Sequence, residues 1–142
     1  MATGSPLPIR LRIPTNMRLV PSTGAVVLVD LPEVPEEHSA APTPDGRTQG
    51  RRMEDARHCL TRLSSCWLPG ARELSHAPLL RVEGTFVEES YFSFSGRVSE
   101  HPEIPDGHLC LTSVVIAYDG RRGSWARTVS RWYRLCAAEP AR

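Results

Sequence analysis

The chain has 142 residues, a net charge of +1 and hydrophobic residues at 40% of its positions. A chain of this length folds as one ordinary domain and buries a core without needing a structural metal or a disulfide. The near-neutral charge creates no global field that would favour nucleic acid or a membrane surface. The longest apolar run, residues 24–31, contains Asp30 and is too short to cross a bilayer.

The cysteines are predicted to be reduced thiols. Residues 1–8 have neither the basic region nor the apolar region of a secretion signal, and thiols stay reduced in proteins that are not exported. We therefore expect a cytoplasmic protein that does not associate with membranes. The four cysteines are Cys59, Cys66, Cys110 and Cys136.

A shift in composition near residue 50 divides the chain. Residues 1–56 contain eight of the thirteen prolines, whereas every aromatic residue lies between Trp67 and Tyr133. Aromatic side chains supply much of the buried area of a small core, and proline cannot donate to a helix or a sheet. The composition predicts a proline-rich arm and flexible linker at residues 1–50, a globular domain at residues 51–136 and a disordered tail at residues 137–142.

Two segments of the arm have the character of short strands. Residues 9–13 alternate apolar and basic side chains, and residues 25–31 are rich in valine. Residues 32–50 are dominated by proline, glycine, alanine and polar residues, a composition typical of a mobile linker.

A helix is predicted from Arg51, because apolar residues recur from there at steps of three and four. This apolar stripe consists of Met53, Ala56, Leu60, Leu63 and Trp67. Pro69 and Gly70 are expected to end the helix. Cys59 and Cys66 lie beside the stripe and are interpreted as small core residues.

Strand patterns follow the helix at residues 79–87, 91–98, 109–118, 124–129 and 132–135. Asp119, Gly120 and Gly123 suit the loop of a hairpin between the third and fourth of these strands. The order of elements predicts an α+β fold. We expect one amphipathic helix packed on a strongly curved antiparallel sheet of four to five strands, with an SH3-like small barrel as one form of it and an extended N-terminal arm.

Residues with catalytic or metal-binding chemistry do not form a recognised motif. His101, Glu103, Asp106 and His108 are candidate zinc ligands, but the prolines and the Asp-Gly pair among them are typical of turns. Cys110 follows His108 by two residues, yet its Leu-Cys-Leu context indicates the interior of a sheet. We therefore expect no catalytic residue, no metal and no cofactor.

A basic and aromatic C-terminal segment is the candidate binding surface, since no acidic residue lies between Gly120 and Ala138. Arginine combined with aromatic rings can pair with phosphates and stack on bases. The alternative is a hairpin whose arginines are solvated and whose tryptophans fill the core. The candidate residues are Arg121, Arg122, Trp125, Arg127, Arg131, Trp132 and Arg134.

A series of turn and strand motifs runs through residues 84–135. The motifs are His101-Pro102, Asp106-Gly107, Thr112-Ser113-Val114-Val115 and Arg131-Trp132-Tyr133-Arg134-Leu135. This series resembles a pattern in small bacterial proteins of unknown function that are carried by phages, plasmids and integrated elements. The resemblance implies a regulator or inhibitor that binds a host protein or protein complex, with anti-CRISPR proteins as the best-known class.

The leading functional hypothesis is a non-enzymatic protein-binding module of a mobile element, which the resemblance links to inhibition of a host defence complex. The second hypothesis is nucleic-acid binding through the arginines of residues 121–134. The third is an enzyme that uses Cys110 with His108, or a metal held by His101 and His108. A homodimer formed through an edge strand of the arm is also open.

Overall fold

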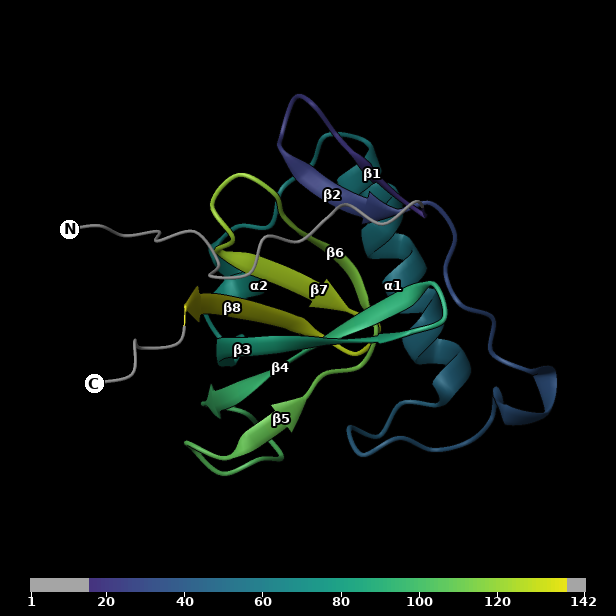
Figure 1. The fold of residues 1–142 in the computed structure, drawn as a ribbon. Coiled ribbons are helices and arrows are strands. Elements are labelled where there is room, and N and C mark those ends of the chain that lie inside the picture. Colours follow the sequence, from purple (N-terminus) through teal and green to yellow (C-terminus); the bar gives the residue numbers. More distant parts are fainter. Residues whose placement is uncertain (1–15, 138–142) are drawn as a thin grey trace.

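The computed structural model describes residues 16–137, in which one long helix packs on a large sheet (Figure 1). The helical segments are η1 (Glu36–His38), α1 (Gln49–Ser64) and α2 (Ala71–Leu74). The strands are β1 (Met17–Leu19), β2 (Ala25–Leu28), β3 (Leu79–Glu88), β4 (Tyr91–Ser99), β5 (Leu109–Leu111), β6 (Val115–Asp119), β7 (Trp125–Thr128) and β8 (Trp132–Ala137). No helix within residues 16–137 combines the length and apolar character required to cross a membrane. The strand predicted at residues 9–13 and positions 138–142 of the predicted tail lie outside the described residues.

The strands form one open sheet in the order β1-β2-β6-β7-β8-β3-β4-β5, so that β1 and β5 are its edges (Figure 1). Neighbouring strands are antiparallel except β3 and β8, which run parallel. The α+β class is therefore confirmed. The prediction of four to five antiparallel strands is wrong, because the sheet is mixed and eight-stranded, and the sheet does not close into a barrel.

Two differences from the predicted strands account for the larger sheet. β1 and β2 come from the first fifty residues, where β2 is the strand suggested by the valine-rich segment and pairs with β6. The apolar stretch predicted as one strand at residues 109–118 is split into β5 and β6. The split occurs at Thr112, whose hydroxyl oxygen accepts a hydrogen bond from the Phe94 N–H and donates one to the Ser113 carbonyl. A side chain that bonds to nearby backbone in this way competes with a regular ladder.

The helix α1 begins earlier than predicted, because the hydroxyl of Thr48 caps it by accepting a hydrogen bond from the Arg51 N–H. The chain leaves the helix at Cys66, which adopts a left-handed conformation with φ 69°. Cys66 is exposed and Cys59 only half-buried, so their interpretation as core residues is wrong for Cys66 and only partly right for Cys59. Of the predicted stripe, Met53, Ala56, Leu60 and Leu63 are buried on α1. Trp67 lies beyond the helix, because α1 ends at Ser64, before the end predicted at Pro69 and Gly70.

The core has two layers, one on each face of the sheet. On one face, α1 contacts β2 and β6. Every residue of β2 and of β7 is buried. On the other face, the ring of Phe92 on β4 lies 6.0 Å from that of Tyr118 on β6, although β7, β8 and β3 separate these strands in the sheet. The sheet therefore bends back on itself and encloses the second layer.

The pairing of β3 with β4 depends on Gly96, because a Cβ at this position would collide with the carbonyl oxygen of Arg81 on the neighbouring strand. We expect Gly96→Ala to lower the free energy of unfolding by about 1–3 kcal/mol, the usual cost of overpacking. Chemical denaturation measures this change.

Gly84 supplies the control, since a Cβ there would meet only the Ser95 hydroxyl at 3.2 Å, and this side chain can rotate away. Gly84→Ala should change stability by about 0.5 kcal/mol or less. Equal stability of the two variants would contradict the close approach of β3 and β4 at Gly96.

Candidate protein-binding surface

Large apolar side chains project from one face of the sheet near its β5 edge. Phe86, Leu109 and Leu111 are 53%, 62% and 58% exposed, respectively. In the register of the sheet Phe86 lies opposite Ser93, and Leu111 lies opposite Ser95. Alternate residues of a strand point to the same side, so these five residues share one face. We call them the apolar face.

The apolar face groups large exposed side chains on one side of neighbouring strands, with Leu109 and Leu111 two residues apart on β5 and Phe86 across β4 from them. Single exposed apolar side chains are normal in soluble proteins, whereas groups of them mark interaction sites. The residues between the large side chains are Gly84, Ser93 and Ser95, which are too small to cover them. The ion pair between Arg97 and Glu83, with an N–O distance of 3.4 Å, borders the face on the side away from the hairpin tip.

The backbone of β5 contributes a short free edge beside this face. The carbonyl of His108 and the N–H of Thr112 both hydrogen-bond to β4. Alternate residues of an antiparallel strand bond to the same neighbour, so the N–H and C=O groups of Leu109 and Leu111 point away from the sheet. A three-residue edge offers little for strand addition. The exposed side chains are therefore the more distinctive feature of this edge.

A hollow with a volume of about 260 Å³ lies on the same side of the β3–β4 hairpin. Phe86, Ser93 and Val114 line it, together with Glu88 and Glu89. Binding sites for small ligands usually have volumes of roughly 300–1,000 Å³ and are largely enclosed. The small, open hollow is therefore better suited to a side chain of a partner than to a cofactor.

An open groove with a volume of about 900 Å³ adjoins the hollow, because Tyr91 lines both. The groove runs between α1 and residues 28–33, with apolar contributions from Leu28, Leu31 and Leu60. The concave surface therefore continues from the apolar face, past the tip of the β3–β4 hairpin, to the exposed side of α1.

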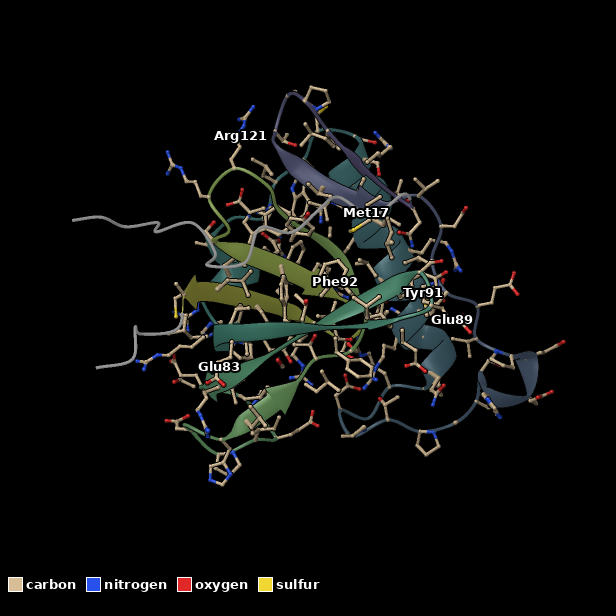
Figure 2. The ribbon with its side chains drawn as sticks, in the orientation of Figure 1. Met17, Glu83, Glu89, Tyr91, Phe92 and Arg121 are labelled. Carbon is tan, nitrogen blue, oxygen red and sulfur yellow. The ribbon has the colours of Figure 1, made fainter. Side chains whose placement is uncertain are left out.

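The hairpin tip is held in a fixed position. The side-chain amide of Asn16 donates a hydrogen bond to the Ser90 carbonyl over 2.6 Å, which ties the start of β1 to the tip. Glu89 has φ 56°, a conformation that residues other than glycine and asparagine rarely adopt. Figure 2 shows Glu89 and Tyr91 together at this tip, with Glu83 farther along the same hairpin.

The structure does not bring the predicted C-terminal arginines and tryptophans together as one exposed surface. Trp125 and Arg127 are each only 6% exposed. Arg121 lies on the loop between β6 and β7, where Figure 2 shows it beside the turn between β1 and β2. Its guanidinium donates a hydrogen bond to the Pro21 carbonyl over 3.0 Å, and its side chain packs against Gly24. Arg121 thus fastens one hairpin to the other.

The tryptophans pack against each other and against arginine, with Trp125 buried and Trp67 and Trp132 half-buried. The ring of Trp132 lies 5.8 Å from that of Trp125 and 5.9 Å from that of Trp67. The guanidinium of Arg127 lies 5.5 Å from the centre of the Trp132 ring, and that of Arg62 lies 3.8 Å from the centre of the Trp67 ring. These contacts join the segment after α1 to β7 and β8.

Two further arginines of the predicted surface form ion pairs with the turn between β4 and β5. Arg131 pairs with Glu103 at 2.8 Å, and Arg134 pairs with Glu100 at 2.6 Å. Among the seven predicted residues, Arg122 is the exposed one whose guanidinium meets no carboxylate or carbonyl within residues 16–137. The acids that pair with these arginines lie in the turn between β4 and β5. The sequence of residues 120–138 alone therefore does not reveal them.

The structure places Cys110 next to Tyr133 and His101 rather than His108. The hydroxyl of Tyr133 lies 3.3 Å from Nε2 of His101, and Tyr133 also hydrogen-bonds to the Cys110 thiol. Burial raises the pKa of the Cys110 thiol, which keeps it protonated and weakly nucleophilic. His108 is exposed. Within residues 16–137, no group of three or more histidine, cysteine or acidic side chains is arranged to hold a metal ion.

Comparison with protein-family models, curated proteins and solved structures found no match to this chain. The apolar face was not predicted from the sequence, because Leu-Cys-Leu was interpreted as the interior of a sheet. That interpretation is right for Cys110 but wrong for Leu109 and Leu111. The alternation of leucine with a smaller residue was the available signal, but it does not say which side faces solvent.

The free energy of unfolding is expected to depend on pH through His101. Its Nδ1 accepts a hydrogen bond from the Glu103 N–H over 3.0 Å, so a protonated imidazole cannot keep this bond. Burial, followed by the charge of Arg131, lowers the pKa of His101 below its ordinary value of 6.5, against a smaller opposing effect of Glu103. The unfolded chain then binds the proton more readily, and stability falls as the pH drops below about 6.5.

Urea denaturation between pH 7.5 and 5 measures this loss. His101→Asn, which keeps an acceptor for the Glu103 N–H, should weaken the pH dependence, whereas His108→Asn at an exposed position should leave it unchanged. A His101→Asn variant with the wild-type pH profile would show that His101 is not the titrating group.

Proposed function

We propose that the protein is a non-enzymatic protein-binding module that uses the apolar face and the adjoining hollow. The observation that carries this proposal is the grouping of Phe86, Leu109 and Leu111, each more than half exposed, on one face at the edge of the sheet. Burial of apolar area is the main favourable term in protein association, and aromatic side chains are frequent anchors of interfaces.

The placement of the C-terminal arginines gives less support to nucleic-acid binding. Such binding draws on several basic groups that are free to contact phosphates. Here Arg131 and Arg134 are paired with carboxylates, Arg127 is buried, and Arg121 bonds to a backbone carbonyl. Because these arginines are paired, buried or bonded to the backbone, the exposed side chains of the apolar face are the stronger candidate for contact with a partner.

The expected partner is a protein of the host. This part of the proposal rests on the resemblance of residues 84–135 to small proteins of mobile elements, which are often regulators or inhibitors that bind a host protein. Inhibition of a defence complex would follow if the apolar face covered a surface that the complex needs for its own assembly or for its target.

Affinity capture from a lysate of the native host, with nuclease treatment, tests the proposal. We expect Phe86→Ser combined with Leu111→Ser to weaken retention of the captured protein by about fivefold or more, as for interface anchors. Stability should change by about 0.5 kcal/mol or less, because both side chains are exposed.

Leu68→Ser is the matched control, since Leu68 is also a large exposed apolar residue, at 43%, but lies outside the apolar face. It should leave retention unchanged. Equal retention by the wild type and the double variant would refute the apolar face as the binding surface. Retention that disappears with nuclease would favour nucleic-acid binding instead.

A further inference from the structure

Charged side chains without partners surround the concave part of the proposed binding surface. Glu88 and Glu89 stand at the hollow, and Asp30 and Glu33 line the adjoining groove. Within residues 16–137, none of these four carboxylates forms an ion pair or a side-chain hydrogen bond.

Several acids elsewhere on the domain are engaged, although Glu36, Glu37 and Glu54 are exposed and form no ion pair or side-chain hydrogen bond within residues 16–137. Asp55, Glu83 and Glu103 each pair with an arginine. Asp119 accepts hydrogen bonds from backbone N–H groups of its own loop. The carboxylates around the hollow are therefore available to a partner, unlike those that stabilise the fold.

The charge is uneven along the concave surface. The groove also contains Arg18 and Arg57, which offset Asp30 and Glu33, whereas the hollow is lined by Glu88 and Glu89 and by no basic residue among those the structure describes. The lining of the hollow therefore combines apolar side chains such as Phe86 with two negative charges. A partner group that fits both must be apolar in the middle and basic at its sides.

The fold defines the backbone that carries the two glutamates at the hollow. Glu88 is the last residue of β3, opposite Tyr91, and Glu89 follows in the turn with φ 56°. The hydrogen bond from Asn16 to Ser90 ties this turn to the start of β1. Both side chains are exposed, so a partner can reach their carboxylates.

We propose that the partner inserts an apolar side chain into the hollow beside Phe86 and pairs flanking arginine or lysine side chains with Glu88 and Glu89. This inference rests on the proposed protein-binding function and specifies the chemistry of the partner. Electrostatic complementarity of this kind mainly sets the choice of partner and the rate of association.

Fluorescence anisotropy with the full chain tests the inference. One labelled peptide alternates leucine with arginine, and a second alternates leucine with glutamate. We expect the basic peptide to bind and the acidic peptide not to bind, with an affinity for the basic peptide that falls as salt rises. Glu88→Gln combined with Glu89→Gln should weaken this binding about threefold to tenfold, as expected for two exposed ion pairs.

Glu36→Gln combined with Glu37→Gln is the matched control. These are also neighbouring, exposed acids, but they lie on η1 outside the hollow and the groove. This control should bind the basic peptide like the wild type. Absence of binding by both peptides, or equal binding of both, overturns the inference.

Two additional comparisons separate the other outcomes. If the captured host protein is lost with Phe86→Ser but retained with Glu88→Gln and Glu89→Gln, the binding function stands and the basic partner does not. If Phe86→Ser leaves capture intact, the proposed function itself fails. Residues 9–13 of this chain also alternate apolar and basic side chains. A tighter complex with the peptide after Arg10→Glu and Arg12→Glu would identify that segment as the occupant and overturn the assignment to a partner.

Discussion

The parallel pairing of β8 with β3 joins the two parts of the sheet, and the remaining structure depends on it. On one side lie β1, β2, β6 and β7, and on the other lie β3, β4 and β5. The register places Leu80 opposite Leu135, and the Arg134 N–H bonds to the Pro78 carbonyl over 2.8 Å. Without this pairing, the strands that carry the apolar face would lack a neighbour beyond β3 and the second core layer would be open.

Local sequence patterns identify the helix and most strands but not their pairing. The apolar stripe from Met53 to Leu63 and the hairpin around Gly120 depend on neighbouring residues, so both could be predicted, although the stripe was extended wrongly to Trp67. The β3–β8 pair connects residues far apart in the chain, and no local signal marks it. The break at Thr112 was also missed, because its cause is a hydrogen bond to Phe94 on another strand.

The candidate site could be predicted less well, because exposure is a tertiary property. Arg127 and Arg131 occupy a basic, aromatic stretch of sequence, yet one is buried and the other is paired with Glu103. Conversely, Leu109 and Leu111 have the residue type of a core and face solvent because β5 ends the sheet. The residues of a strand do not show whether it lies at the edge of its sheet. The exposure of Leu109 and Leu111 therefore could not be predicted from the sequence.

We propose that the apolar face at the edge of the sheet and the adjoining hollow, which Glu88 and Glu89 line, bind a protein partner. Site-specific photo-crosslinking in the native host tests this claim most directly. A photoreactive phenylalanine derivative at position 86 should crosslink to one discrete protein, whereas the same group at position 68 should not. Equal crosslinks from both positions, or none from position 86, would contradict the account.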